Sequence, residues 1–468
     1  MLPQEFEQRM RGLVGSRYDE LAAWAARPLT TRGMRVNTLK CSAEQLAACV
    51  GFPVCSVPFA APGWMTDAAF RAGSDPLHHA GAYYMQEPSA MSAVTLLAPK
   101  AGERVLDLCA APGGKSTQIA AALQGDGLLW ANEYVPNRAR ILAQNIERCG
   151  IRNAVVSVGD TARVAEALPL WFDAVLADVP CSGEGMFRKE PEALTGWSVE
   201  NIRLCASRSR EILDNAARCV RPGGRLVMST CTFAPEENEW AIVRFLHDHP
   251  EFSLESAEVT FGEAGFEAEA IAPFGEPELL EFSKTVPLSR CRRIFPWHGG
   301  EGHFLALLRR TGDSRIVDVA TKAASDRSGA VDAAKALYAE CFKGEPEGEF
   351  VRNGDTVRLL PPHLPDAQGV HLLCAGVVAA QVMQGRTLRL EPAHALFQSA
   401  KAADCRHLLN FRCDDPRLLA FLRGEEVAAE APDGWTGVAI EGITTGFGKV
   451  SKGRLKNRYP KGLRLLHG

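Results

Sequence analysis

The chain has 468 residues and a formal net charge of −4 at pH 7, and 46% of its residues are hydrophobic while 23% are charged. A chain of this length and composition can bury several cores, so we expect an ordinary soluble protein of two to four domains. The slightly acidic balance excludes a protein that is basic throughout. Any surface for a nucleic acid must therefore be local.

Fourteen cysteines are spread along the chain without a C-x-x-C pair or a Cys/His cluster of zinc spacing. This pattern argues against a disulfide framework and against a structural metal, and it is typical of a reducing compartment. The first residues have neither a basic start nor an apolar core, and no apolar run approaches the ~18 residues of a membrane span. We expect a cytoplasmic protein with no metal and no membrane segment.

Residues 1–80 predict a small α/β domain. A helix is expected over 4–14, an extended segment over 34–40 and a second helix near 43–50. Within the extended segment, Arg35-Val36-Asn37 could contact a phosphate, although a surface arginine on a strand is the commoner case. Nothing local decides between these two interpretations.

From residue 81 to 311 the pattern alternates between apolar strands and amphipathic helices. Such alternation predicts an α/β domain whose parallel sheet is covered on both faces and binds ligands at the carboxyl ends of its strands. The residues that follow each strand therefore have priority as site candidates. The expected strands are 104–108, 128–133, 154–158, 172–177 and 225–230, and the expected helices are 116–124, 137–149, 161–168, 199–220 and 236–247.

The turn after the first of these strands is a nucleotide-type site. Gly113 and Gly114 lack Cβ atoms and precede a helix start, whose free N–H groups can meet a ligand. The turn does not match the dinucleotide motif G-x-G-x-x-G. It also does not match the phosphate loop G-x-x-x-x-G-K-[ST], because Lys115-Ser116 lacks the first glycine at the required spacing, so both motifs are excluded. Glu133 stands about twenty residues further on, where an acid that binds a ribose is expected. A solvated Glu at a strand end is equally compatible with that position.

Two later strands each end in a thiol. Asp178-Val179-Pro180-Cys181 follows one strand and Thr230-Cys231 follows the next, so both cysteines should face one crevice. Most cysteines are buried small hydrophobes, but a place at a strand's carboxyl end beside an acid favours a chemical role.

A thiol, an acid and a nucleotide-like cofactor together suit methylation of a pyrimidine at C5. That carbon is a weak nucleophile until a thiolate adds to C6, and a nearby cation such as Lys115 would favour the thiolate. An acid at the amino edge of the ring and a base for the C5 proton complete the chemistry. Asp178 and the second cysteine are placed for these tasks.

The combined motifs resemble the Nop/Sun family of RNA cytosine-C5 methyltransferases, which use S-adenosylmethionine. The resemblance covers about 1–310 and also takes in Arg35-Val36-Asn37, 86–89 and 302–304; the form Asp-Val-Pro-Cys departs slightly from the usual Asp-Ala-Pro-Cys. Its most specific motifs are Asp107-Leu108-Cys109-Ala110-Ala111-Pro112-Gly113-Gly114-Lys115, Asp178-Val179-Pro180-Cys181-Ser182-Gly183 and Ser229-Thr230-Cys231-Thr232.

The resemblance implies a Rossmann-like methyltransferase core with an RNA-binding α/β domain at its N-terminus. By it Cys231 is the nucleophile, Cys181 assists release of the product, Asp178 contacts the cytosine or the reacting end of the donor, and Lys115 belongs to the same crevice. Glu133 would bind the ribose and Asp160 would lie near the adenine. The implied cofactor-binding set is Cys109, Ala110, Ala111, Pro112, Gly113, Gly114, Lys115, Glu133, Arg138, Asp160 and Asp178, with Cys109 acting by packing or through its backbone.

The remaining segments are assigned by composition. Residues 254–281 hold eight Glu and no basic residue, which indicates a solvated loop or insertion, while 292–296 and 302–308 predict a final edge hairpin of the sheet. A linker is expected over 312–344, a first C-terminal domain over 345–400 and a last domain over 401–468.

The last domain contains a basic stretch over 449–464 with seven basic residues and no acidic one. Its interspersed Leu, Gly and Tyr favour an ordered edge that faces RNA, although a solvated cationic tail is the common alternative. This stretch and 182–189 look more specifically like the bacterial RsmF-type branch, which modifies small-subunit ribosomal RNA and carries a C-terminal PUA-like RNA-binding domain. That likeness implies ribosomal RNA or the small ribosomal subunit as partner.

Two hypotheses follow. The first is an rRNA cytosine-C5 methyltransferase that works as a monomer on a cytosine flipped out of any stack. The second is a catalytically silent, RNA-binding ribosome-assembly factor that keeps the cofactor fold. The presence of both thiols favours the first, and a methyltransferase for protein or small molecules explains neither the thiols nor the basic stretch.

Overall fold

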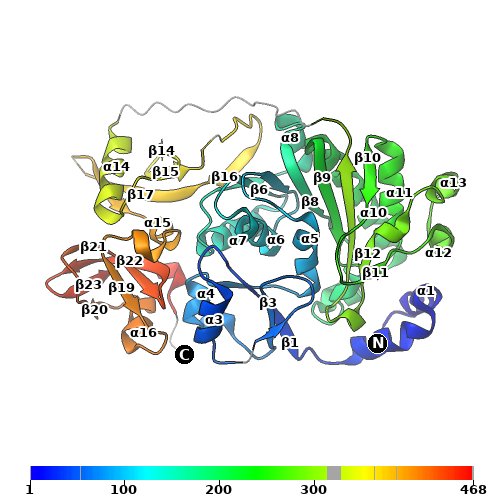
Figure 1. Ribbon diagram of the computed structural model, residues 1–468, viewed down its shortest axis with the longest axis horizontal. Coiled ribbons are helices and arrows are strands. Elements are labelled where there is room, and N and C mark those ends of the chain that lie inside the picture. Colours follow the sequence, from blue (N-terminus) through cyan, green and yellow to red (C-terminus); the bar gives the residue numbers. More distant parts are fainter. Residues whose placement is uncertain (1, 53, 314–327, 363, 386, 466–468) are drawn as a thin grey trace.

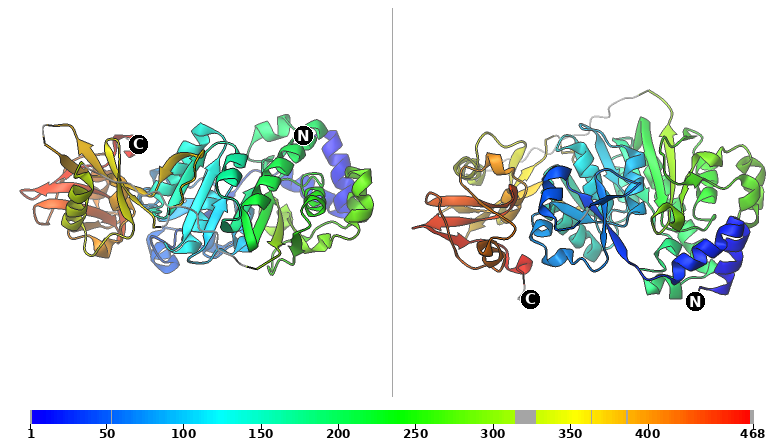
Figure 2. Two further views of the ribbon diagram at one scale, coloured as in Figure 1. Left: turned by 90° about the horizontal axis from the view of Figure 1, so that it is seen from above. Right: turned by 60° about the horizontal axis from the view of Figure 1, so that its bottom comes forward.

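The computed structural model describes residues 2–52, 54–313, 328–362, 364–385 and 387–465. These residues form four sheets, of ten, five, four and four strands. The ten-stranded sheet lies in the middle of an elongated arrangement, with two helices of the N-terminal region at one end and two C-terminal sheets at the other (Figures 1 and 2).

The central sheet is built on five parallel strands whose order reverses at β5. The chain runs outward from β5 through β6 to β7, returns, and continues on the other side of β5 with β8 and β9. Ligands of such sheets bind outside the carboxyl ends of the strands at this reversal. The strands are β5 (Arg104–Asp107), β6 (Leu128–Glu133), β7 (Ala154–Val158), β8 (Phe172–Asp178) and β9 (Val220–Thr230).

Helices cover both faces of these strands, as the alternating pattern predicts. Successive residues of a strand point to opposite faces. Val105 therefore packs in the core under α5, α6 and α7, and Leu106 packs in the core under α8, α10 and α11. The predicted strands and helices of this core are confirmed to within a few residues at their ends. The helices are α5 (Ser92–Leu97), α6 (Gly114–Leu123), α7 (Pro136–Arg148), α8 (Thr161–Ala167), α10 (Val199–Cys219) and α11 (Glu239–Asp248).

Antiparallel strands extend the sheet beyond β9. The predicted hairpin is confirmed as β12 (Arg292–Ile294) and β13 (His303–Arg310), and β13 pairs directly with β9. The expected solvated loop over 254–281 is wrong for its apolar residues, because Ile271 is fully buried and accepts a hydrogen bond from Trp240. The many acids of this segment masked widely spaced apolar positions that reach the core. Its elements are β10 (Phe252–Glu255), β11 (Glu263–Ala264), α12 (Ala268–Ile271) and α13 (Leu280–Ser283).

The N-terminal region combines a small sheet with separate helices. The sheet has the order β2-β3-β1-β4, and the predicted helices are confirmed as α1 and α3. Phe6 of α1 packs on Phe187 and Trp197 of the core, so this helix lies far from its own sheet. The elements are α1 (Gln4–Val14), α2 (Tyr18–Ala26), β1 (Thr31–Val36), α3 (Ala43–Cys49), β2 (Cys55–Ser56), β3 (Gly63–Asp67), α4 (Pro76–His79) and β4 (Tyr83–Met85).

The segment after the core forms a four-stranded sheet of its own, with the order β14-β15-β17-β18, but it also gives one strand to the central sheet. β16 (His371–Ala375) pairs antiparallel with β7 and so becomes an edge strand of the central sheet. A helix, α14 (Ala330–Cys341), occupies the expected linker because its Leu337, Tyr338 and Cys341 are buried, while the linker residues 314–327 lie outside the described residues. The other elements are β14 (Glu349–Asn353), β15 (Thr356–Leu360), β17 (Val377–Met383), β18 (Arg389–Pro392) and α15 (His394–Gln398).

The last sheet is joined to the rest of the molecule through a partly buried lysine. Lys40 donates to the main-chain oxygen of Gln398 and to both oxygens of Thr444, at 2.8 Å each for the latter. Burial lowers the pKa of Lys40 to about 7, while its oxygen acceptors favour the ammonium form. The elements of the last region are β19 (Leu408–Phe411), α16 (Pro416–Leu422), β20 (Val427–Ala428), β21 (Gly434–Ile440), β22 (Ile443–Ser451) and β23 (Arg454–Asn457).

In the part of the chain that the structure describes, no helix is long and apolar enough to cross a membrane.

Candidate active site

The glycine turn follows β5 at the reversal of strand order. Gly113 has φ +113°, which L side chains rarely adopt, and a Cβ there would come within 3.1 Å of Leu142. Beneath the turn, Asp107 is fully buried and accepts a hydrogen bond from Ser116 at 2.6 Å, while its Oδ1 has no hydrogen-bond partner. Burial raises the pKa of Asp107 to about 7. The turn thus offers a close backbone approach over an unsatisfied carboxyl oxygen.

Three further residues of the expected cofactor set lie along the same edge of the sheet. Glu133 ends β6, accepts hydrogen bonds from the main-chain N–H of Ala111 at 3.3 Å and of Val135 at 2.9 Å, and is 3% exposed. Arg138 donates to the main-chain oxygen of Ala111 at 2.9 Å. Asp160 is exposed after β7 and caps α8 through the N–H of Ala162. These residues therefore also shape the turn and its flank.

The two thiols predicted to share a crevice are in contact. Cys181 and Cys231 follow the neighbouring strands β8 and β9, and their sulfur atoms are 3.4 Å apart. The hydrogen bond with Cys231, together with burial, raises the pKa of Cys181 well above its usual range. Cys181 is therefore a protonated thiol at neutral pH, able to donate to a thiolate at Cys231. Burial likewise raises the pKa of Cys109, in agreement with a packing or backbone role.

A salt bridge lies beside the thiols. Lys115 donates to Oδ2 of Asp178 at 2.7 Å, and Ser229 donates to Oδ1 of the same carboxylate at 2.6 Å. Burial disfavours the charged form of both residues, but the attraction between the carboxylate and the ammonium group is stronger. The pKa of Asp178 is therefore lowered and that of Lys115 is raised. The pair is ionised at neutral pH. The structure thus brings the four expected catalytic residues together at the carboxyl ends of β8 and β9.

Two buried carboxyl groups hold the thiol loops, and the sequence interpretation missed both. Glu184 accepts from Trp197 at 2.8 Å and from the side chain of Thr232 and the N–H of Phe233 at 2.9 Å each. Glu237 accepts two hydrogen bonds from Ser182, and burial raises its pKa to about 8. Both glutamates bond residues next to a thiol. Glu184 lies within the motif 182–189, so its position in the sequence was a usable signal. Glu237 offered no signal, since its partner lies 55 residues away.

The arginine of the N-terminal segment is a core residue. Arg35 is 4% exposed and donates to Thr117 at 2.7 Å and to the main-chain oxygen of Gly114 at 3.1 Å. The side chain of Arg35 is therefore used inside the protein and is not exposed for contact with a phosphate. Instead, Arg35 fixes the start of α6 to the N-terminal sheet.

The basic stretch near the C-terminus is ordered. It covers the end of β22, the turn that follows, all of β23 and the residues after it. Within it Leu455 and Tyr459 are buried, while Lys452, Arg454 and Lys456 are exposed. This agrees with an ordered edge and not with a free tail. Whether the edge contacts RNA stays a prediction.

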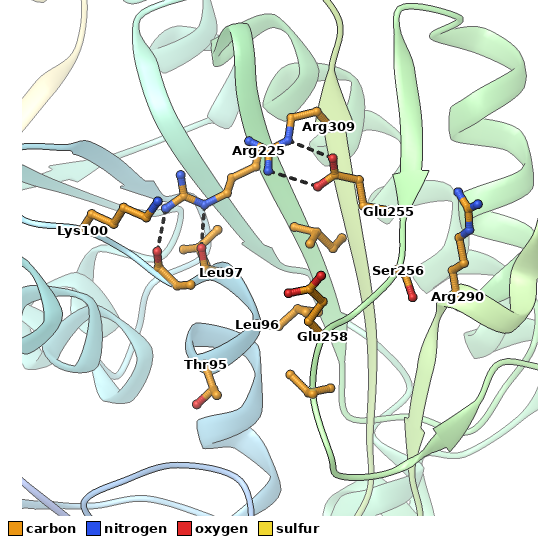
Figure 3. A pocket seen from close by; sticks show the side chains of 13 residues that line it. Thr95, Leu96, Leu97, Lys100, Arg225, Glu255, Ser256, Glu258, Arg290 and Arg309 are labelled. Carbon is orange, nitrogen blue, oxygen red and sulfur yellow. Dashed lines mark hydrogen bonds and ion pairs between the residues drawn. The ribbon is translucent and has the colours of Figure 1, made fainter.

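A cavity of about 690 Å³ lies toward the amino ends of the parallel strands, away from the thiols at their carboxyl ends (Figure 3). Its Arg225 pairs in register with Ala174 near the start of β8, whereas Asp178 and Ser229 pair at the carboxyl ends. Arg225 reaches the main-chain oxygen of Leu97 and Arg309 pairs with Glu255. This cavity is separate from the thiol crevice.

A parallel sheet with an antiparallel β13 at one side, a glycine turn after its first strand and an acid after the second define a Rossmann-like methyltransferase. Comparison with known proteins agrees. Models of the 16S rRNA methyltransferase RsmB/F family, of the RsmF N-terminal domain and of the RsmF PUA domain match residues 94–309, 2–88 and 409–465. The chain belongs to the RsmB/F family.

Individual relatives agree with that membership. Two Escherichia coli proteins named ribosomal RNA small subunit methyltransferase F are 42% identical over 257 residues and 41% identical over 321 residues. The matches cover 53% and 66% of this chain but only 53% and 63% of those proteins, so the chain spans less than two thirds of their length.

Two solved structures from Pyrococcus horikoshii share the fold. A methyltransferase homolog is 31% identical with a TM-score of 0.55, and the match covers 66% of this chain and 95% of that one. NSun6, determined with SFG, an analogue of S-adenosylmethionine, is 22% identical with a TM-score of 0.53, and the match covers 66% of this chain and 99% of that one.

Proposed function

We propose that this chain methylates cytosine at C5 in RNA, with S-adenosylmethionine as methyl donor and the 16S rRNA of the small ribosomal subunit as substrate. The observation that carries the proposal is the contact of two reduced thiols, Cys181 and Cys231, beside an ionised Asp178–Lys115 pair. Methylation of an oxygen, a nitrogen or a protein side chain needs no thiol pair, whereas a pyrimidine C5 needs a nucleophile at C6. The names of the relatives support RNA as substrate.

The residues around the glycine turn fit S-adenosylmethionine. The unpaired Oδ1 of Asp107 calls for a hydrogen-bond donor such as an ammonium group. Gly113 keeps the tight turn that leaves the backbone open to a ligand, because a side chain there would strain the backbone and meet Leu142. Glu133 stands where a ribose hydroxyl would be bound, and Asp160 stands beyond it toward the base. When bound, S-adenosylmethionine supplies an activated methyl group to the crevice.

The side chains then divide the work on the cytosine. The thiolate of Cys231 forms a bond to C6, which makes C5 nucleophilic; C5 takes the methyl group, loses its proton to a base, and the Cys231–C6 bond breaks. Cys181, 3.4 Å from the nucleophile, is placed to exchange a proton with that sulfur as it leaves. Asp178, held by Lys115, would face the cytosine ring and stabilise charge on the amino edge of that ring.

The proposal has one competitor, the catalytically silent RNA-binding assembly factor. Bisulfite sequencing of rRNA from a strain without the gene separates the two. We expect one or more cytosines to lose methylation and to regain it on complementation with the wild-type gene but not with a Cys231→Ala gene. An unchanged 5-methylcytosine pattern would exclude the enzyme and leave the assembly factor.

RNA binding is proposed for the edge formed by β22 and β23. Its exposed Lys452, Arg454 and Lys456 carry positive charge on an ordered surface, which suits the phosphate backbone. Neutralising all three should weaken rRNA binding and reduce the salt slope of the affinity by about two. Arg454 itself pairs with Glu426, so the matched control neutralises three other arginines of the same region that pair with acids, Arg412, Arg417 and Arg423. Equal slopes in both variants would contradict this assignment.

We further propose that the chain acts as a monomer in the cytoplasm, where rRNA is assembled into subunits. Mass photometry of the protein with and without a fragment of 16S rRNA would test the monomer.

A further inference from the structure

His303 is a buried residue of the crevice to which the proposed chemistry gives no task. It begins β13, and the next residue, Phe304, pairs with Thr230, which directly precedes Cys231. The side chain of His303 is 2% exposed, and its Nε2 has no hydrogen-bond partner. That nitrogen lies 3.8 Å from Oδ1 of Asp178. A buried, unpaired ring nitrogen beside the carboxylate of the site requires an explanation.

The two nitrogens of this ring compete for one proton. Nδ1 lies 3.2 Å from the main-chain oxygen of Gly302, and Nε2 faces the carboxylate of Asp178. Both neighbours are acceptors, but a neutral imidazole carries a single N–H. The ring can therefore donate to Gly302 or to Asp178, and not to both. The nitrogen that carries the proton decides which contact can be a hydrogen bond, and the contact with Asp178, at 3.8 Å, must shorten to become one.

The ring stays neutral over the pH range in which such an enzyme works. Burial and the ammonium of Lys115 lower the pKa of His303 to about 4, against the opposing influence of Asp178 and Glu87, the acids that face it. His303 therefore carries a single ring proton and does not change charge in the site over that range.

The two oxygens of Asp178 have different surroundings. Oδ2 accepts from Lys115, whose side chain is 12% exposed and borders the crevice. Oδ1 accepts from Ser229, which is fully buried, and faces His303. One oxygen is thus anchored in the protein interior, and the other is available to a ligand that draws Lys115 away.

We propose that His303 is a positioning residue, which donates its Nε2–H to Oδ1 of Asp178 and fixes the direction in which Oδ2 meets the target base. This inference rests on the proposed methylation of cytosine. The donation matters most when the cytosine enters, because Oδ2 is then shared between Lys115 and the cytosine, and Oδ1 needs a second donor besides Ser229 to keep the direction of the carboxylate. A carboxylate held in the direction of the base lowers the barrier to addition of the thiolate.

A pair of amide substitutions separates this role from packing. The amide of Gln can reach the position of Nε2 and donate to Asp178, whereas the shorter Asn can replace only Nδ1 and its contact with Gly302. We expect His303→Gln to keep kcat within about threefold of wild type and His303→Asn to lower it on the order of tenfold or more. The KM for RNA and the affinity for S-adenosylmethionine should change little in either.

Two further measurements isolate the step. In the Cys181→Ala background, the rate of covalent RNA adduct formation on denaturing gels should fall with His303→Asn and be restored with His303→Gln. The pH dependence of kcat between pH 6 and 9 should be the same for wild type and His303→Gln, since neither side chain titrates in that range. Urea unfolding of both variants shows whether their stabilities match.

The outcomes discriminate between the two proposals. If wild type methylates rRNA but the Asn and Gln variants are equally active or equally impaired, the positioning role is overturned and the proposed function stands. If the Asn variant loses affinity for S-adenosylmethionine in proportion to its activity, His303 belongs to the cofactor site and the inference is wrong. If wild type methylates no RNA, the proposed function fails and this inference fails with it.

Discussion

The carboxyl ends and the amino ends of the parallel strands, called here the carboxyl edge and the amino edge of the central sheet, differ in how their polar groups are satisfied. At the carboxyl edge, Asp107 and His303 each keep a buried polar atom without a hydrogen-bond partner, and two thiols lie in contact. At the amino edge, Arg225 makes four hydrogen bonds and Arg309 pairs with Glu255, although the cavity there measures about 690 Å³. Among the described residues, no buried side-chain polar atom that lines this cavity lacks a partner.

The difference teaches that, of these two regions, the one with unpaired polar atoms and adjacent thiols carries the expected chemistry, although the other has the cavity. A hydrogen bond that the folded protein leaves unmade costs about 1–3 kcal/mol and persists where a ligand completes it. The N–H donors of a fully paired arginine such as Arg225 already bond to the protein itself. We therefore expect substitutions at the carboxyl edge to change chemistry and those at the amino edge to change stability.

The largest effect is expected from Cys231→Ala. Removal of the nucleophile should abolish methylation of RNA, while calorimetric titration should give an affinity for S-adenosylmethionine close to that of wild type, since Cys231 lies outside the glycine turn. Residual turnover would mean that another group attacks C6. Cys109→Ala is the matched control: Cys109 is a partly buried thiol with a raised pKa in the turn itself, and its loss should leave methylation measurable.

Cys181→Ala should stop the cycle one step later. Without the neighbouring thiol the Cys231–C6 bond should form and persist, so a slowly migrating protein–RNA species should accumulate on a denaturing gel. The double variant with Cys231→Ala should show none of it. Absence of the species in the single variant would remove Cys181 from product release.

The sequence predicts those thiols because the signal is local. Each follows a short apolar strand, and the alternation of strands and helices places the ends of such strands along one edge. The support for the thiols is not local: Glu237 acts on Ser182 across 55 residues, and β16 joins the edge of a sheet whose other strands end far earlier in the chain. Pairings of this kind depend on which surfaces meet in the fold, and nothing in the composition of either segment specifies the partner.

The amino edge is tested by Arg225→Met. This arginine is 9% exposed and bonds Glu103 and the main-chain oxygens of Leu97 and Ala98, so its removal leaves buried acceptors and a carboxylate unpaired. Urea unfolding should show a loss of about 3 kcal/mol. Arg309→Met, in the same cavity but with a half-exposed ion pair, should cost less than about 1 kcal/mol. A normal stability with lost methylation or RNA binding in Arg225→Met would make this cavity a functional site.

The smallest effect is expected for Glu237, which holds the loop of Cys181, and it should appear in the pH dependence of the protein's stability. Burial raises the pKa of Glu237 to about 8 in the folded state, whereas the unfolded chain releases this proton near the ordinary value of a glutamate. Between these values the folded state holds one more proton than the unfolded state, so this group stabilises the fold at low pH and its contribution falls as pH rises toward 8. Glu237→Gln stays neutral and keeps an acceptor for Ser182, so its Tm should fall less than that of wild type from pH 5 to pH 8. Parallel Tm profiles for the two proteins would mean that Glu237 is ionised throughout, and the acid that holds the Cys181 loop would then be a charged partner of Ser182.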